Sequence, residues 1–234
     1  MAKWPQNLVL IRHGESEYNL ERRLIALGES DGHSDGLKLT RNADIVLTKE
    51  GIQQARATGD FLHERYEKFD VVFVSPFKRA DETAEHILAA WHADMPPIMV
   101  DERLREKEFG IFFALTEREI KDRYPEWALL RSIEGRYYFR PPGGESYPDV
   151  AIRVRSFLAT IVRDWAGKNV LIVSHAAVLL AFHKILARMS ERAILELVES
   201  AEIKNCAMIT YKPGMVAGTE REELVPQAFN TIAY

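Results

Sequence analysis

Cysteine is nearly absent from this 234-residue chain, whose single Cys206 stands among apolar neighbours. One thiol cannot form an intramolecular disulfide, and it has no second cysteine with which to bind a metal. Long hydrophobic runs are lacking too, because the longest, 170–182, is broken by Ser174 and His175. Only four consecutive apolar residues precede Arg12, so we expect neither a signal peptide nor a membrane span. These absences favour a reducing, cytoplasmic setting.

An excess of positive charge is also missing. The chain has 31 Lys and Arg residues against 35 Asp and Glu residues, which gives a net charge of -4. This sign does not attract phosphate backbones or anionic lipids, so we expect no nucleic-acid or membrane partner. With 47% hydrophobic and 28% charged residues, the composition is typical of a globular protein, and we predict one domain over residues 1–234.

Short apolar runs alternate with helical patterns along the chain. The runs at 8–11, 71–74 and 170–173 are wholly apolar, which is typical of buried parallel strands. Thr48 and Ser146 stand as helix N-caps in front of amphipathic segments, and Asp149 completes a capping box with Ser146. This alternation predicts an α/β fold with a mostly parallel central sheet.

Two segments depart from the alternation. Residues 103–147 follow a fourth predicted strand at 98–100, and we expect them to form an inserted cap over one edge of the sheet. Within this cap segment, Thr116 and Glu119 have the spacing of a capping box for a short helix. Residues 28–36 contain three glycines among Ser, Asp and His, and they predict an exposed, mobile loop.

Polar side chains follow each of the first three predicted strands. Arg12 and His13 come after the first strand, Arg79 after the second and His175 after the third. Ligands of open parallel sheets bind beyond the carboxyl ends of the strands, so we expect these four side chains to meet. Guanidinium groups match phosphate oxygens, and the chain has neither a phosphate-binding glycine loop nor a metal-binding motif. The sequence therefore predicts a metal-independent phosphoryl site.

These residue types suit phosphoryl transfer through a covalent intermediate. The charges of Arg12 and Arg79 disfavour protonation of His13, which leaves an exposed, neutral imidazole as nucleophile. We expect His175 to be a cationic donor to the phosphate oxygens. Either histidine alone is more often structural, and the hypothesis depends on the whole set.

The leaving oxygen also needs a proton, for which we select Glu106. This residue follows the predicted strand at 98–100, and a carboxylic acid in reach of the leaving oxygen accelerates its departure. Glu102 and Glu108 are close alternatives for the general acid. The remaining alternative is that Glu106 is a surface carboxylate without a catalytic role.

In their order along the chain, the motifs resemble those of the histidine phosphatase superfamily, which includes cofactor-dependent phosphoglycerate mutases and many phosphatases. They are Arg-His-Gly-Glu-Ser at 12–16, Ser-Pro-x-x-Arg-Ala at 75–80, Leu-x-Glu-x-x-Phe-Gly at 104–110, Gly-Gly-Glu-Ser at 143–146 and Val-Ser-His at 173–175. The resemblance implies a three-layer α/β/α sandwich. It also implies a phosphohistidine on His13, with Glu106 as acid and then base.

The same resemblance implies the phosphate pocket. Arg12, Arg79 and His175 would hold the phosphoryl group, and Asn19 would be a further phosphate contact. Ser16, in the first motif, joins these candidates for phosphate binding.

The cap segment offers candidate contacts to the rest of the substrate. Arg136 and Arg140 suggest a second negative group on the substrate, although they could equally pair with surface carboxylates. The aromatic residues 137–139 between them favour packing within the cap over a ligand platform.

The choice between phosphatase and mutase depends on the cap segment. Phe109 and Glu117 replace a tyrosine and a lysine that the mutases have, and residues 136–146 resemble the broad-range acid phosphatase branch. Residues 189–197, in contrast, are similar to a mutase helix. We expect a phosphatase of small phosphomonoesters that needs no cofactor. The alternatives are a phosphoglycerate mutase that uses 2,3-bisphosphoglycerate, and a catalytically weak phospho-ligand-binding protein. The expected partner is a small phosphorylated substrate, and a homodimer stays open.

Overall fold

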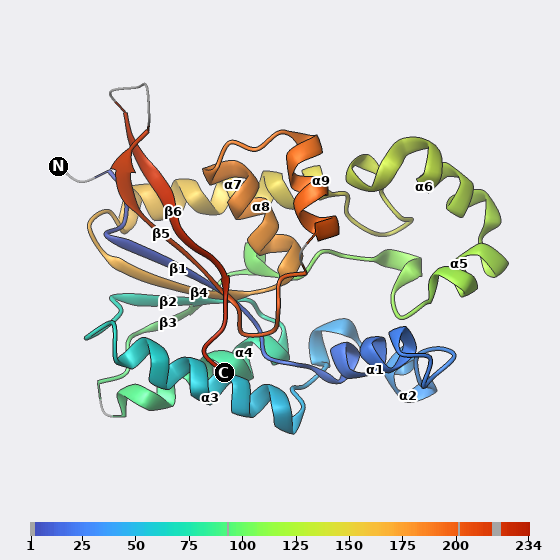
Figure 1. Ribbon diagram of the computed structural model, residues 1–234, viewed down its shortest axis with the longest axis horizontal. Coiled ribbons are helices and arrows are strands. Elements are labelled where there is room, and N and C mark those ends of the chain that lie inside the picture. Colours follow the sequence, from blue (N-terminus) through green and yellow to red (C-terminus); the bar gives the residue numbers. More distant parts are fainter. Residues whose placement is uncertain (1–2, 93, 201, 217–220) are drawn as a thin grey trace.

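The computed structural model of the protein describes residues 3–92, 94–200, 202–216 and 221–234. Its centre is a six-stranded sheet with the strand order β3-β2-β4-β1-β5-β6 (Figure 1). The strands are β1 (Asn7–Arg12), β2 (Val71–Val74), β3 (Ile98–Val100), β4 (Asn169–Ser174), β5 (Met208–Met215) and β6 (Glu222–Thr231).

Helices cover both faces of this sheet. In Figure 1, α3 and α4 lie on one side of the strands, and α7 and α8 lie on the other. The helices are α1 (Glu17–Ala26), α2 (Asp35–Leu39), α3 (Lys49–His63), α4 (Lys78–Leu88), α5 (Glu117–Arg123), α6 (Pro125–Tyr138), α7 (Tyr147–Asp164), α8 (Ala176–Leu186) and α9 (Glu191–Ser200). None of the helices in the described part of the chain is both long and apolar enough to span a membrane.

The strand directions confirm the predicted fold class. β1 pairs with β4, β4 with β2 and β2 with β3, all in parallel. The last two strands are antiparallel, since β5 pairs with β1 and β6 pairs with β5. The prediction of a three-layer α/β/α sandwich with a mostly parallel sheet is therefore correct. The sequence analysis did not predict β5 and β6.

The apolar runs are continuous because each central strand supplies two cores. Leu8 and Leu10 of β1 pack on the side of α7 and α8. Val9 and Ile11 point to the opposite side and pack with residues of α3 and α4. Successive side chains of a strand alternate between its faces, so a strand covered on both faces has no polar position. β1, which carries the first motif, is thus fully buried.

The helix starts follow the predicted caps. The Thr48 hydroxyl accepts a hydrogen bond from the Gly51 amide at the start of α3. Ser146 with Asp149, and Thr116 with Glu119, each form a reciprocal capping box, at α7 and α5. Each box satisfies two amide groups that the helix itself leaves free. These caps fix where α5 begins within the cap segment and where α7 begins at its end.

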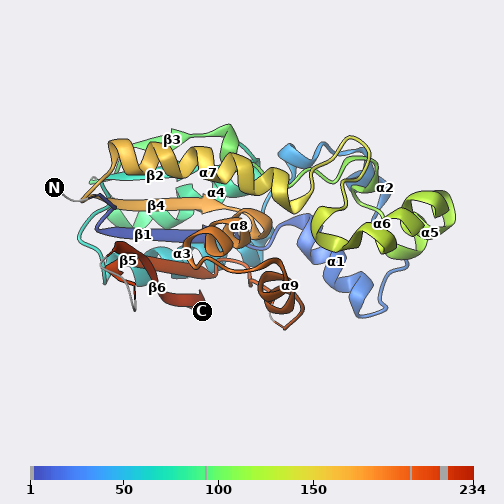
Figure 2. The same cartoon turned by 90° about the horizontal axis from the view of Figure 1, so that it is seen from above.

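The segment 103–147, for which a cap over one edge of the sheet was predicted, has its two helices past one end of the strands. Two short 3-10 turns, Glu102–Leu104 and Gly110–Phe112, precede α5 and α6. Figures 1 and 2 both show α5 and α6 beside α1 and α2, past the end of the strands. A salt bridge of 2.9 Å between Lys38 and Glu119 joins α2 to α5.

The segment 28–36 is more ordered than the glycine content suggested. The Ser34 side chain caps α2, which begins at Asp35. His33 is buried, its ring stacks on Tyr18 with centroids 4.9 Å apart, and its Nδ1 lies 3.2 Å from Glu21. The expectation of an exposed loop was wrong for His33, because an aromatic and a carboxylate neighbour bury it.

Candidate active site

The backbone of His13 is held by the end of β4 and by the turn that precedes β5. Its amide donates to the Ser174 carbonyl at 2.9 Å, at the end of β4. Its carbonyl accepts from the Cys206 amide at 3.2 Å and from the Asn205 side chain at 3.1 Å. The next residue, Gly14, lies so close to α3 that an added Cβ would stand 2.5 Å from the Gly51 carbonyl oxygen. This packing fixes where the His13 ring leaves the chain.

The hydrogen bonds of the His13 ring define its free nitrogen. Nδ1 donates to the Gly14 carbonyl at 2.7 Å, so the proton of the neutral ring lies there. Nε2 accepts from Arg79 Nε at 3.3 Å and keeps its lone pair. Burial, and then the charges of Arg79 and Arg12, lower the pKa of His13 well below its usual value. The geometry thus favours a neutral ring with an unprotonated Nε2. Its predicted exposure was wrong, because only 2% of the residue is exposed.

His175 lies at the end of β4, where it forms the N-cap of α8. Its Nε2 is 2.7 Å from the Ser75 hydroxyl, which itself accepts from the Phe77 amide. In the tautomer in which Ser75 donates its proton to Nε2, the neutral imidazole carries its own proton on Nδ1, the nitrogen that faces the Glu106 carboxylate. That Nδ1 is buried and has no hydrogen-bond partner among the described residues. It is a donor that a ligand oxygen can satisfy.

The charge expected for His175 is not found in the ligand-free protein. Burial, and then the charge of Arg79, lower the pKa of His175 well below its usual value. A fully buried ring beside two arginines loses too much hydration to take up a proton. This lowered pKa favours a neutral ring, whereas a cationic donor was predicted from the sequence. The sequence also gave no role to Ser75, which orients His175.

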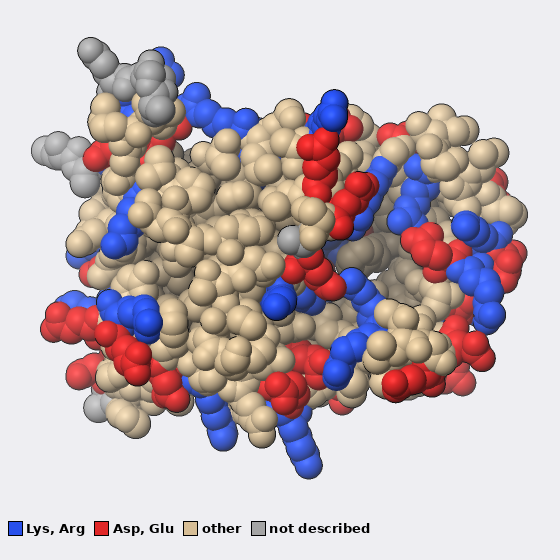
Figure 3. Space-filling view, in the orientation of Figure 1, with Lys and Arg blue, Asp and Glu red and all other residues tan. Residues whose placement is uncertain are grey.

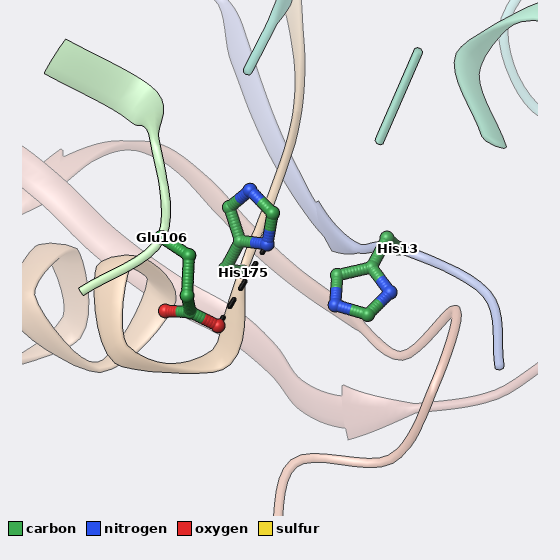
Figure 4. Close-up of side chains that lie close together, drawn as sticks. All are labelled: His13, Glu106 and His175. Carbon is green, nitrogen blue, oxygen red and sulfur yellow. Dashed lines mark ion pairs between the residues drawn. The ribbon is translucent and has the colours of Figure 1, made fainter. Parts of the chain in front are cut away.

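Glu106 reaches the site from the loop after the first 3-10 turn of the cap segment. One carboxylate oxygen accepts from the Lys107 amide at 2.8 Å, and the other lies 3.7 Å from His175 Nδ1 (Figure 4). Burial raises the pKa of Glu106, although Arg79 opposes this effect. A raised pKa favours the protonated form that a general acid requires.

The three reactive side chains converge from distant parts of the chain. One ligand atom each of His13, Glu106 and His175 lies within 4.8 Å of the others. Such donors also suit a transition metal. Arg79, however, donates to the very nitrogen of His13 that a metal would need, and its positive charge opposes a cation. The arrangement therefore fits an anion better than a metal ion.

Two arginines supply the positive charge. The Arg12 guanidinium donates to the Ile203 carbonyl, and its buried Nε has no partner among the described residues. Arg79 donates to the Asn42 carbonyl at 2.7 Å. Burial lowers the pKa of Arg79 to about 10, which still leaves it charged at neutral pH. A phosphate oxygen would satisfy the free Nε of Arg12 and add negative charge to that of Glu202, whose carboxylate lies 3.7 Å from Arg12 Nη1.

Ser16 and Asn19 stand at the start of α1, beside Arg12. Ser16 is the N-cap, and the two side chains form the capping box of this helix. The Asn19 Oδ1 also accepts from Asn205 at 3.0 Å, so its amide NH₂ is the group left to face a ligand. Both residues line the same cavity as His13. Ser16 is placed to orient Asn19 as well as to contact a ligand.

These side chains surround a cavity of about 490 Å³. In Figure 3 a hollow separates the body of the molecule from the cap, and basic and acidic side chains surround its mouth. The described residues that line the cavity are Arg12, His13, Ser16, Tyr18, Asn19, Arg22, Asn42, Arg79, Glu106, Phe109, Phe113, Arg136, Tyr147, Ala176, Ala177, Leu180, Val198, Glu199, Glu202 and Ile203.

The cavity includes residues that sequence reasoning missed. Tyr18 lines it and stacks on Phe113, with centroids 5.7 Å apart. Arg22, Glu199 and Glu202 line the mouth. Arg22 is four residues beyond Tyr18 on α1, so the two side chains lie on the same face of the helix. That spacing is the signal in the sequence that links them. No motif marks the two glutamates.

The two predicted cap arginines differ in their position. Arg136 lines the cavity, while Arg140 lies outside it and pairs with Asp149 on α7. Of the alternative acids, Glu108 accepts from the Gly110 amide at 3.2 Å, and neither it nor Glu102 lines the cavity. The aromatic residues 137–139 mostly pack as expected, since Tyr137 and Phe139 are buried.

Comparisons with known proteins agree with this arrangement. A family model for the histidine phosphatase superfamily (branch 1) matches residues 8–214. A 2,3-bisphosphoglycerate-dependent phosphoglycerate mutase 2 of Gloeobacter violaceus is 35% identical over 227 residues, which cover 94% of this chain and 91% of that protein.

Two further proteins widen the comparison. A 6-phosphofructo-2-kinase/fructose-2,6-bisphosphatase of Caenorhabditis elegans is 34% identical over 193 residues, which cover 82% of this chain and 36% of that protein. A mycobacterial glucosyl-3-phosphoglycerate phosphatase superposes with a TM-score of 0.72 at 24% identity, over 96% of this chain and 99% of that one. The latter similarity concerns the fold.

Proposed function

Because the chain belongs to the histidine phosphatase superfamily, we propose that it is a phosphatase that hydrolyses small phosphomonoesters through a phosphohistidine on His13. The observation that carries this proposal is the convergence of His13, Glu106 and His175 within 4.8 Å of one another. A nucleophile, an acid and a neutral donor are thereby in reach of one phosphoryl group.

The first half of the reaction forms the phosphohistidine. The lone pair on His13 Nε2 attacks phosphorus while the bond from phosphorus to the leaving oxygen breaks. Glu106 gives its proton to that oxygen, and the alcohol departs. Arg79 must first release Nε2, and a phosphate oxygen offers its guanidinium a stronger, charge-assisted acceptor. Arg12 and His175 Nδ1 then donate to the other oxygens.

The second half restores the enzyme. The Glu106 carboxylate takes a proton from water, whose oxygen attacks phosphorus as the bond to His13 breaks. The electron pair returns to Nε2, and inorganic phosphate leaves. No step needs a group beyond the side chains already named and water.

The cap segment favours hydrolysis over the phosphoglycerate mutase reaction. A mutase must retain an intermediate with two phosphates and a carboxylate, for which it needs further cations. In this chain Glu117 replaces a lysine of the mutases, and its carboxylate pairs with Arg131 at 2.8 Å. The residue before it, Thr116, caps α5. Neither supplies a cation.

A mutase is the second candidate, favoured by the relative that is 35% identical. Phosphorus NMR of the purified protein with 3-phosphoglycerate and a trace of 2,3-bisphosphoglycerate separates the two. We expect free phosphate from this mixture, or no reaction with it followed by cleavage of a generic aryl phosphate. Growth of 2-phosphoglycerate without free phosphate would overturn the proposal.

A further inference from the structure

A carboxylate at the mouth of the cavity is shared by two arginines. Glu202 Oε1 lies 3.0 Å from Arg22 Nη2 and 3.7 Å from Arg12 Nη1. The carbonyl of the next residue, Ile203, also accepts from Arg12. All four residues line the catalytic cavity (Figure 3 shows its mouth). The chain thus places its own negative charge where an anionic part of a substrate would otherwise meet Arg22.

The charges around the cavity balance once a phosphoryl group is bound. The described lining residues include four arginines and three glutamates. Arg12 and Arg79 face the phosphoryl group, and Glu106 is neutral when it acts as acid. What remains for the leaving group is Arg22 and Arg136 against Glu199 and Glu202. The mouth therefore has no surplus positive charge for a second anionic group.

The uncharged part of the lining has a matching character. Phe109 and Tyr147 line the cavity from the cap side, and Leu180 and Val198 line it from α8 and α9. Against apolar and aromatic walls of this kind, an uncharged ligand surface pays a smaller desolvation penalty than a carboxylate.

We propose that Glu202 is a specificity-determining residue that directs the site to phosphomonoesters whose leaving group carries no negative charge. It acts in two ways, by neutralising Arg22 and by repelling an incoming carboxylate. This inference rests on the proposed hydrolytic function and names its substrate class. Since the side chains of Glu202 and Arg22 are 63% and 55% exposed, solvent screens the effect, which is therefore modest and salt-dependent.

A matched pair of substrates tests the proposal. Glycerol 3-phosphate and 3-phosphoglycerate differ in a hydroxymethyl group against a carboxylate. We expect the unaltered protein to have the higher kcat/KM for glycerol 3-phosphate. Glu202→Gln should reduce this preference about three- to tenfold, mainly through a lower KM for 3-phosphoglycerate. Added salt should shrink the difference between protein and variant.

Two further variants separate the effect of the contact between Glu202 and Arg22 from the effect of the net charge of the cavity. Glu199→Gln removes the same charge from the same cavity, but the described contacts pair no arginine with Glu199, so we expect a smaller change. Arg22→Gln in the Glu202→Gln background should remove the part of the gain that the freed guanidinium supplies and keep the part that comes from the lost repulsion. Thermal melting of each variant checks that the fold is kept.

The outcomes distinguish the two proposals. Phosphate release with an unchanged preference in Glu202→Gln, or an equal change for both substrates, would overturn the role of Glu202 alone. A protein that interconverts phosphoglycerates and releases no phosphate from either compound would overturn the hydrolytic function and the substrate class together.

Discussion

The two ends of the catalytic cavity are held in place differently. The phosphoryl end consists of Arg12, His13, Arg79, Glu106 and His175. Backbone groups or buried side chains fix each of them, as when Ser75 orients His175 at 2.7 Å. The mouth consists of Tyr18, Arg22, Arg136, Glu199 and Glu202. There the defined charged contact is the half-exposed pair of Arg22 and Glu202.

This difference separates chemistry from selection. Burial shifts the pKa of His13 downward and that of Glu106 upward, which sets both for proton and phosphoryl transfer. At the mouth, water and salt screen each charge, so its contacts bias binding by smaller amounts. Substitutions at the phosphoryl end should therefore change kcat by orders of magnitude, while those at the mouth should change KM by a few fold.

The largest effect is expected from His13→Asn. The asparagine amide keeps a donor for the Gly14 carbonyl but lacks the nucleophilic Nε2, so turnover should fall on the order of 10⁴-fold or more with the fold retained. Trapping of acid-labile phosphoryl label, beside a melting curve, measures both. A variant that still traps label on histidine would show that another residue is the nucleophile.

Glu106→Gln should have the next largest effect. Loss of the acid should slow cleavage of alkyl phosphates about 100- to 10,000-fold, and cleavage of an activated aryl phosphate much less, because that leaving group needs no proton. Glu108→Gln is the matched control, since its carboxylate lies outside the cavity lining. Equal slowing of both substrates by Glu106→Gln would assign the acid elsewhere.

The pH dependence of kcat/KM should test how burial sets the protonation of Glu106 and His13 at the phosphoryl end of the cavity. Glu106 must be protonated, and its pKa is raised, so alkyl phosphate cleavage should fall about tenfold per pH unit above that pKa. His13 must be neutral, and its lowered pKa keeps it so as the pH falls into the acid range. Activity should therefore extend to acid pH and be lost as pH rises. An aryl phosphate that retains this alkaline loss would contradict the role of Glu106.

The smallest effect is expected at the mouth. Arg136→Ala removes an exposed guanidinium from the cavity lining, and we expect KM to rise about three- to fivefold with kcat unchanged. Arg140→Ala is its control, because Arg140 pairs with Asp149 outside the cavity. If both variants had the same kinetics, Arg136 would have no part in binding.

The same division explains what the sequence could predict. Arg12, His13 and His175 follow buried apolar strands, and the direction of parallel strands brings their ends together. This reasoning assumes that β1 and β4 pair so that their ends meet. In the structure Arg12 of β1 pairs with Ser174 of β4, as the reasoning requires. Glu106 was selected from its place after the predicted strand at 98–100, and spacing alone left Glu102 and Glu108 as alternatives until the family resemblance also pointed to Glu106.

Other features depend on contacts that spacing does not encode. Glu202 meets Arg22 across 180 positions of the chain, and no local pattern marks either. The neutral state of His175 follows from its complete burial beside Arg79, which only packing reveals. β5 and β6 were missed because β6 is mostly half-exposed or exposed and β5 contains Pro213 and Gly214, so neither has the apolar run of a central strand.

The position of β1 in the sheet also determines the order in which the site is assembled. β1 is synthesised before the other five strands of this sheet, yet its two neighbours, β4 and β5, begin at Asn169 and Met208. Its hydrogen bonds close only over long stretches of chain, which makes them late events in folding. A ribosome-bound chain that has not yet exposed β5 therefore carries His13 without the backbone contacts that position its ring, and the site can form only after β5 has left the ribosome.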